Sequence, residues 1–133
     1  MAEPGFAEAV PLAGLLGIEI VAAEPEEVRG SLLWRADLCT SGGILHGGVL
    51  MALADTLGGV CAFLHLPEGA GTATVESKTN FFRPVRDGVV TGVARPLHAG
   101  RSFIVVQTDL TDPSERRVAQ VTQTQAVIAR RSE

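Results

Sequence analysis

The stretch that most constrains the fold of this chain spans residues 47–66 and reads GGVLMALADTLGGVCAFLHL. It is long enough for about five turns of helix, and its one carboxylate, Asp55, lies among apolar and small residues. A helix that is apolar on every side is normally buried, and this length would also suit a membrane span. Asp55, the glycines at 58 and 59, and His65 argue against a span. We therefore predict a central core helix of about residues 47–65.

Asp55 is the first candidate functional residue. Burying an ionised carboxylate is unfavourable unless the group is paired, hydrogen-bonded or protonated. A carboxylate in this helix therefore indicates either a catalytic group or a structural one that caps or pairs with another buried group. The residues alone leave both interpretations open.

The start of the predicted helix is the second candidate site, because His46, Gly47 and Gly48 lie there. Unpaired backbone N–H groups and the positive end of the helix dipole favour an anion or a developing oxyanion at such a position. Glycines also let a substrate approach the backbone closely. The alternative interpretation is that Gly47 and Gly48 only permit a tight turn.

Length and composition exclude several classes of function. The 133 residues fit a single domain, 1–133. The formal charge is −4 and Lys78 is the only lysine, so the chain lacks the basic footprint of a nucleic-acid-binding protein. Cys39 and Cys61 form no CxxC pair, which argues against a zinc site or a disulfide framework. No Lys or Arg precedes Arg29, unlike the basic start of a signal peptide, so we expect a cytoplasmic protein.

The rest of the sequence predicts strands around the helix. Residues 6–15 predict a short helix, interrupted by Pro11, that packs on the domain. Alternating or apolar runs predict six strands, at 17–23, 27–35, 72–82, 88–97, 101–110 and 117–128. Their short connections predict antiparallel hairpins. The expected fold class is α+β, with an antiparallel sheet of about six strands wrapped around the long helix.

The strand at 72–82 differs from the others because polar residues occur on both of its faces. Strict alternation places Thr72, Thr74, Glu76, Lys78, Asn80 and Phe82 on one face, and Ala73, Val75, Ser77, Thr79 and Phe81 on the other. This strand is therefore not expected to be an ordinary core strand.

Three motifs resemble those of a known family: ILHGGVLMALADTLGG, NFFRPVRDG and GVARPLHAGRS. Together with the order of elements, they resemble the hotdog-fold thioesterases, in particular the PaaI-like group that hydrolyses acyl-CoA thioesters. The resemblance covers most of residues 17–128. Its most specific part is His-Gly-Gly followed, nine residues after His46, by the carboxylate of Asp55. The last motif is also similar to thioesterases that act on dihydroxynaphthoyl-CoA or on aroylated carrier proteins, although those usually carry Glu at this position.

The resemblance implies roles for four residues. Asp55 would be the nucleophile or the general base, and the backbone N–H of Gly47 would be the oxyanion donor. His46 would lie beside the thioester and help to orient it, although a structural, hydrogen-bonded histidine is an equal alternative. Thr74 falls where related enzymes place a hydroxyl that holds the attacking water. The implied reaction uses no cofactor and no metal, since CoA is part of the substrate.

The chain also departs from the family pattern. A side-chain amide is common six residues before the motif histidine, where this chain has Thr40, whose shorter side chain could still bind substrate by a hydrogen bond. Gly59 lacks the hydroxyl found there in some members. For the phosphates of CoA, basic residues at strand ends are candidates, with solvated loop charges as the alternative: Arg83, Arg86, His98 and Arg101. Arg101 is the preferred candidate because it follows Gly100 in the family-like hairpin.

The spacing of the two catalytic candidates predicts an oligomer. Gly47 and Asp55 are eight residues apart, or roughly 12 Å along one helix. One thioester carbonyl cannot meet both groups of the same helix. We therefore expect a twofold homodimer in which each site combines the helix start of one subunit with the carboxylate of the other. Hotdog proteins resemble this arrangement, and many form tetramers from two dimers.

Other functions remain open at this stage. A non-catalytic acyl-CoA sensor and a thioesterase acting on acyl carrier protein would both suit the same fold. A hotdog hydratase is less well supported, because its Asp and His pair is not found here. The aliphatic and aromatic residues of the helix region would accept either a medium alkyl chain or an aromatic ring as the acyl group.

Overall fold

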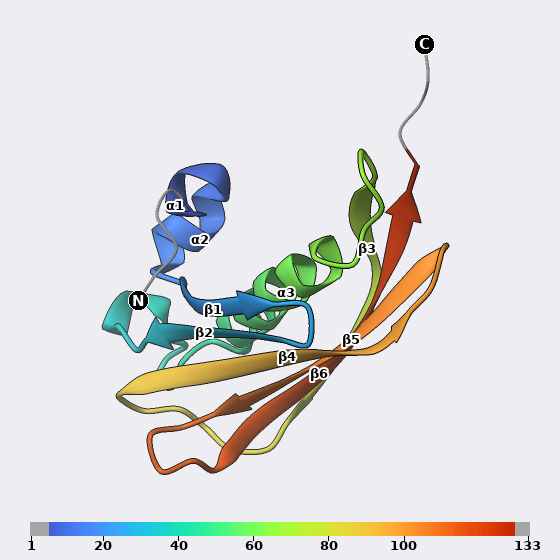
Figure 1. Ribbon diagram of the computed structural model, residues 1–133. Helices are drawn as coiled ribbons and strands as arrows, with labels where there is room; N and C mark the ends of the chain where they lie inside the picture. Colours follow the sequence, from blue (N-terminus) through green and yellow to red (C-terminus); the bar gives the residue numbers. More distant parts are fainter. Residues whose placement is uncertain (1–5, 130–133) are drawn as a thin grey trace.

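The computed structural model describes residues 6–129 of the chain. Six strands form one antiparallel sheet in the order β1-β2-β4-β5-β6-β3, and helix α3 (Gly47–Phe63) lies against one face of the sheet (Figure 1). The strands are β1 (Glu19–Glu24), β2 (Glu27–Leu33), β3 (Gly71–Phe81), β4 (Val89–Ala99), β5 (Phe103–Thr111) and β6 (Arg117–Ile128). Helix α3 contacts all six strands. The predicted α+β architecture of a sheet curved around a central helix is confirmed.

Helix α3 is buried along one stripe only. Its buried residues recur at helical spacing, at Leu50, Leu53, Ala54, Leu57, Gly58, Cys61 and Ala62. The opposite side carries Asp55, which is exposed, together with Met51 (39% exposed) and Phe63 (64% exposed). The prediction of a helix buried on every side is therefore wrong for the single chain, because the sheet covers only one face of it.

Leu57 of α3 packs against the sheet at two glycines. Gly30 of β2 and Gly92 of β4 are paired directly across the strands. A Cβ atom at either position would collide with the Leu57 side chain. This pair of glycines therefore forms the depression in the sheet that receives the middle of α3.

Two short helices precede the sheet, α1 (Phe6–Ala9) and α2 (Pro11–Leu16). Pro11 is the first residue of α2, a position where its missing N–H breaks no helical hydrogen bond. Gly17 ends α2 with a φ of +79°, in the left-handed region that favours glycine. The two helices contact β1 and α3 and form a wall beside the exposed side of α3 (Figure 1).

The predicted hairpins are present. β1 pairs with β2, β4 with β5, and β5 with β6, each antiparallel. β3 does not pair with a sequence neighbour: it joins β6 and forms an edge of the sheet. This edge position explains why both faces of β3 carry polar residues and why most of its side chains are exposed.

A bulge in β3 changes which residues face the helix. The pairing with β6 slips between Thr74, opposite Gln125, and Glu76, opposite Thr124. Val75 is the extra residue, so alternation is interrupted there. The side chains on the helix side are therefore Thr72, Thr74, Ser77, Thr79 and Phe81, which corrects the two faces expected from strict alternation.

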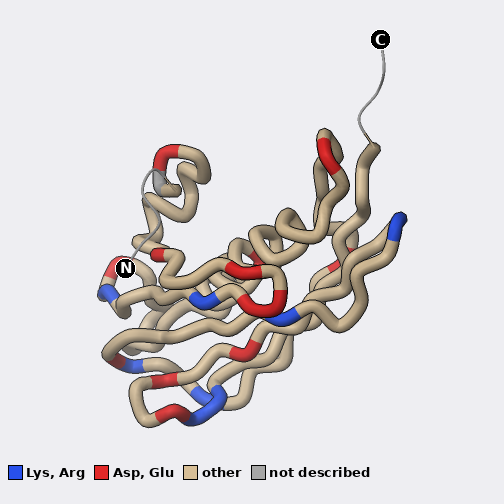
Figure 2. The backbone as a smooth tube through the Cα atoms, in the orientation of Figure 1, with Lys and Arg blue, Asp and Glu red and all other residues tan. Residues whose placement is uncertain are grey.

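Charged residues of both signs are interspersed along the chain (Figure 2). Within residues 6–129, no helix has both the length and the apolar character needed to cross a bilayer.

Candidate active site

Asp55 lies at the middle of the exposed side of α3, and two side chains hold it there. Thr74 Oγ1 of β3 and Gln123 Nε2 of β6 each donate a hydrogen bond of 2.9 Å to Asp55 Oδ1. Asp55 Oδ2 has no hydrogen-bond partner among residues 6–129. One carboxylate oxygen is thus fixed by the sheet, and the other is open.

The start of α3 is capped by the side chain of His46. His46 Nδ1 accepts a hydrogen bond of 2.8 Å from the backbone N–H of Gly48. Because Nδ1 is an acceptor, the neutral imidazole carries its proton on Nε2, on the far side of the ring. Gly48 accommodates this cap, since a Cβ there would lie 2.9 Å from His46 Nδ1. His46 therefore has a structural role and retains one free ring N–H.

The backbone N–H of Gly47 is the open donor of this first helical turn. Val49 N–H and Leu50 N–H reach the carbonyl of His46, and Gly48 N–H reaches its ring. Gly47 N–H has no acceptor within the described part of the chain. The Phe81 ring packs against Gly47, where a Cβ would lie 3.1 Å from Phe81 Cζ. Glycine at this position therefore gives access to the backbone and room for the ring.

Thr40 lies in the loop before α3 and is tied to that loop. Its N–H donates to Ile44 O over 2.8 Å, and its hydroxyl lies 3.2 Å from Ser41 O and 3.3 Å from Ile44 O. Thr40, Gly47 and Arg83 all line a cavity of ≈ 370 Å³ at the start of the helix. The structure thus brings these three predicted residues together.

A larger apolar cavity of ≈ 600 Å³ opens beside Asp55. Its walls come from the N-terminal helices, β1, β3 and the exposed side of α3: Phe6, Ala9, Val10, Leu12, Ile20, Ala23, Asp55, Thr56, Gly59, Val60, Phe63 and Thr72. Among these described residues, Asp55 is the one charged member. A Cβ atom at Gly59 would meet no described atom within 4 Å, so the missing side chain enlarges the open space. The sequence predicts only a packing role for the N-terminal helix, and its place in this wall was missed.

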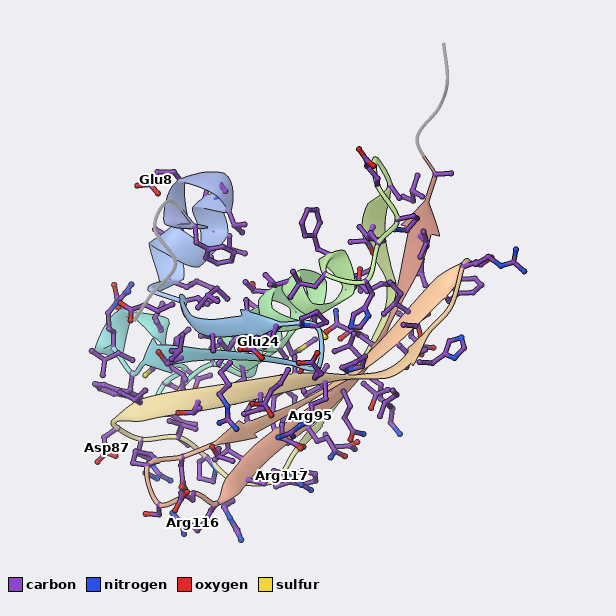
Figure 3. All side chains as sticks on the ribbon, in the orientation of Figure 1. Glu8, Glu24, Asp87, Arg95, Arg116 and Arg117 are labelled. Carbon is purple, nitrogen blue, oxygen red and sulfur yellow. The ribbon has the colours of Figure 1, made fainter. Side chains whose placement is uncertain are left out.

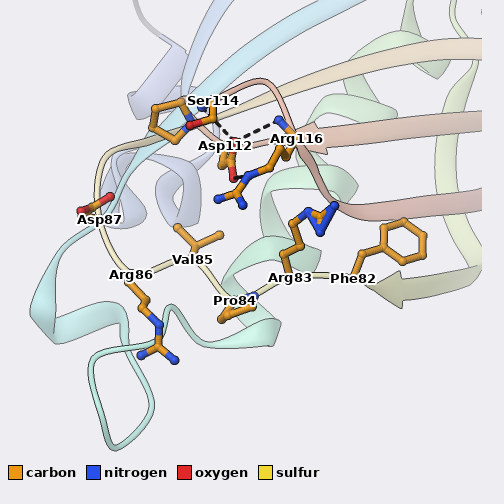
Figure 4. Close-up of a pocket in the computed structure, with 10 residues that line it drawn as sticks. Phe82, Arg83, Pro84, Val85, Arg86, Asp87, Asp112, Ser114 and Arg116 are labelled. Carbon is orange, nitrogen blue, oxygen red and sulfur yellow. Dashed lines mark hydrogen bonds and ion pairs between the residues drawn. The ribbon is translucent and has the colours of Figure 1, made fainter.

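The basic candidates fall at two opposite ends of the sheet. Arg83 and Arg86 line a cavity of ≈ 520 Å³ with Asp112 and Arg116, in which Arg86 points away from the other two arginines (Figure 4). Arg116 and Asp87 lie at this same end of the molecule (Figure 3). Within the described residues, Arg83 and Arg86 form no ion pair.

Arg116 is already engaged with Asp112. The backbone N–H groups of Arg116 and Ser114 and the Arg116 guanidinium donate to the Asp112 carboxylate over 3.0, 2.9 and 3.0 Å (Figure 4). These donors, the Arg116 N–H first, lower the pKa of Asp112 below its usual 3.8. Arg116 is therefore less available to an anion than Arg83.

His98 and Arg101 lie at the other end, around the β4–β5 hairpin. Arg101 lines a cavity of ≈ 760 Å³ with His65 and Gly100, next to the end of α3. His98 packs over Gly100, where a Cβ would lie 2.6 Å from His98 Nε2. In one chain, these residues are separated from the Gly47 end by the length of β4. The single chain therefore does not gather all the predicted substrate-binding residues into one site.

Two site residues were missed from the sequence: Gln123 and Gln125. They occupy alternate positions of β6 that face α3 and are 0% and 1% exposed. The signal that could have found them is the pair of glutamines at the inward positions of an otherwise apolar strand face, in VTQTQAV.

A long helix wrapped by an antiparallel sheet is the architecture of the hotdog class of α+β proteins, and this chain adds a carboxylate open at the middle of the helix and a bare N–H at its start. The chain belongs to the Thioesterase superfamily, whose family model matches residues 42–119. This membership confirms the predicted resemblance and supports a hydrolase acting on thioesters or esters.

Individual relatives agree with the family. The crystal structure of thioesterase HI1161 from Haemophilus influenzae is similar with a TM-score of 0.85 and 33% identity, covering 89% of this chain and 82% of that one. The structure of Rv1847 from Mycobacterium tuberculosis has a TM-score of 0.89 and 31% identity, covering 92% of this chain and 100% of that one. Proofreading thioesterase EntH of Klebsiella pneumoniae is 40% identical over 75 residues, which are 56% of this chain and 55% of EntH.

Proposed function

We propose that the protein hydrolyses acyl-CoA thioesters, with an aryl or medium-chain alkyl acyl group, to the free acid and CoA. The observation that carries this proposal is Asp55, with Oδ1 held by two donors and Oδ2 open. The adjoining apolar cavity of ≈ 600 Å³ has the size and character of a small-molecule pocket and suits an acyl group of either kind.

In the proposed reaction, the Gly47 N–H stabilises the oxyanion that forms on the thioester carbonyl. Asp55 Oδ2 either attacks the carbonyl carbon, giving a mixed anhydride that water then hydrolyses, or removes a proton from the attacking water. The CoA thiolate leaves and is protonated. The free ring N–H of His46 would orient the thioester, and the Thr74 hydroxyl oxygen would accept a hydrogen bond from the water.

The proposal includes a twofold homodimer, alone or paired into a tetramer, with the active sites at the subunit interface. Two features support it. Gly47 and Asp55 are on one helix, roughly 12 Å apart along its axis, so a second subunit is needed to bring an N–H to a carboxylate. Exposed apolar side chains also occur on α3, at Met51 and Phe63, and along or just after β3, at Val75, Phe81 and Phe82.

The phosphates of CoA would be bound by the basic residues. Arg83 lines the cavity at Gly47, and Thr40 and Gly48 form the adjoining loop and turn. Arg101 and His98 lie at the far hairpin, where the second subunit could bring them to the same substrate. We also assign the enzyme to the cytoplasm, where the free thiols of Cys39 and Cys61 would remain reduced.

The test is hydrolysis of a panel of aryl- and alkyl-CoA thioesters, followed by thiol release, with the wild type and Asp55→Ala. Turnover that disappears in the folded variant supports the proposal and identifies the acyl class. Binding of acyl-CoA without turnover by the wild type would favour a non-catalytic sensor. Turnover of acyl carrier protein thioesters alone would show that the substrate is carried by that protein rather than by CoA. Sedimentation of the active protein as a monomer would contradict the shared site.

A further inference from the structure

Gln123 and Gln125 are polar side chains buried in the sheet face that packs on α3. A buried amide is unfavourable in an apolar core unless hydrogen bonds compensate for its lost hydration. Both amides form such bonds, and the bonds lead to Asp55. These two residues therefore form a connected polar network with the proposed catalytic carboxylate.

One branch of the network passes through Thr74. Gln125 Nε2 donates to Thr74 Oγ1 over 2.6 Å, and the Thr74 hydroxyl donates to Asp55 Oδ1 over 2.9 Å. A hydroxyl has one proton, so accepting from Gln125 directs that proton to Asp55. On the other side of the same amide, Thr72 Oγ1 lies 3.1 Å from both Gln125 Oε1 and Ala126 O, so these two acceptors share its one proton.

The second branch is direct. Gln123 Nε2 donates to Asp55 Oδ1 over 2.9 Å, while Gln123 Oε1 is buried and has no partner among the described residues. The amide packs against Gly58 of α3, where any Cβ atom would overlap it. An apolar side chain would fill this space without an unsatisfied acceptor, so packing alone does not account for glutamine here.

The bulge in β3 determines which residue of that strand lies opposite Gln123. Because the pairing slips at Val75, both Thr72 and Thr74 before it and Ser77 after it face the helix. Thr74 is paired directly with Gln125, and Ser77 with Gln123. Without the slip, Glu76 rather than Ser77 would lie opposite Gln123 and face the helix, so the bulge keeps a second carboxylate away from Asp55.

We propose that Gln123 and Gln125 are positioning residues for thioester hydrolysis: Gln123 directly, and Gln125 through Thr74, hold Asp55 Oδ1 so that Oδ2 faces the reacting carbonyl. This inference rests on the proposed function. Among the described residues that line the cavity beside Asp55, no other is charged, and β3 and β6 present to the carboxylate the Thr74 hydroxyl and the Gln123 amide.

The decisive variant is Gln123→Met, which keeps the length of the side chain and removes its hydrogen bonds. We expect kcat to fall about 10- to 100-fold through misorientation of the carboxylate, with KM changed less than about twofold. The split between kcat and KM is the readout, because it separates loss of an orienting contact from loss of substrate binding.

Gln120→Met is the matched control. It is the same substitution in the same strand, and Gln120 Nε2 also donates to an aspartate, Asp109 Oδ1, over 2.9 Å. Asp109 is outside the site, so we expect kcat and KM of this variant to match the wild type. A similar kinetic loss in both variants would show a general effect on β6 and overturn the inference.

Gln123→Glu tests the same point if the Met variant does not fold. A glutamate of equal size repels Asp55 when ionised and donates to it when protonated, so kcat should fall at neutral pH and partly recover as the pH is lowered. Wild-type kcat in either folded Gln123 variant would overturn the positioning role, whereas loss of turnover in Asp55→Ala would still support the proposed function. If the wild type does not hydrolyse thioesters, the proposed function itself is contradicted.

Discussion

The two groups of the proposed chemistry lie at the start and at the middle of α3, and they are positioned in different ways. At the start of α3, the proposed oxyanion donor is the backbone N–H of Gly47, and the neighbouring side chains only cap the helix or pack against it. At the middle of α3, the proposed nucleophile or base is the Asp55 side chain, and its orientation is fixed by residues of β3 and β6. The first part depends on local backbone geometry and the second on a long-range side-chain network. Substitutions should therefore affect the two parts differently.

The largest effect is expected at the middle of the helix, for Asp55→Asn. The substitution preserves shape and removes the nucleophile or base, so kcat should fall about 10²- to 10⁴-fold. Because Asp55 is exposed, the stability should change little. Steady-state kinetics together with thermal unfolding measure both quantities. A variant that loses activity only because it unfolds would contradict this assignment.

At the start of the helix, Gly47→Ala should lower kcat about 100-fold even though the N–H remains. The new Cβ would lie 3.1 Å from Phe81 Cζ, so either the ring or the helix start must shift. The double variant Gly47→Ala with Phe81→Leu relieves this contact and should recover part of the loss. No recovery in kinetic measurements would show that access to the backbone, rather than the fit of the ring, requires glycine.

Two substitutions of His46 separate its possible roles, which are capping the helix and orienting the substrate. His46→Asn supplies another N-cap acceptor for Gly48 N–H, so its free energy of unfolding should stay near that of the wild type. His46→Ala removes the acceptor and should lower the free energy of unfolding by about 1 kcal/mol. If the ring N–H orients the thioester, both variants should lose about tenfold in kcat/KM, a typical size for one hydrogen bond. Wild-type kinetics for His46→Asn would leave the cap as the sole role.

The helix start was the more predictable of the two parts. The His-Gly-Gly motif and the carboxylate nine residues after His46 lie within one continuous segment, so sequence spacing predicts both α3 and its two candidate groups. The hairpins were predictable for the same reason, since their partners are sequence neighbours. The end of α3 at Phe63 lies close to the predicted boundary at 65.

The support for Asp55 was not predictable, because it depends on long-range pairing. β3 joins β6 across the intervening β4–β5 hairpin, and the bulge at Val75 has no glycine or proline to mark it. Without that bulge, alternation gives the wrong faces for β3. The one-sided burial of α3 was also hidden, because its exposed side contains apolar residues such as Met51 and Phe63. A surface that a second subunit could cover has the same composition as a core.

The smallest functional effect is expected for Asp112, a carboxylate that lies outside the site and has at least as many hydrogen-bond donors as Asp55. Asp112 is held by two backbone N–H groups and by Arg116, and these lower its pKa below the usual 3.8. A depressed carboxyl pKa contributes stability that is present above the unfolded value and is lost as the pH falls through the folded value. Asp112→Asn should therefore remove part of the acid dependence of unfolding near and below about pH 4 and leave kcat and KM unchanged. Thermal unfolding from pH 3 to 7, with kinetics at pH 7, measures this difference. A change in KM would instead show that Asp112, through Arg116, affects substrate binding beside Arg83.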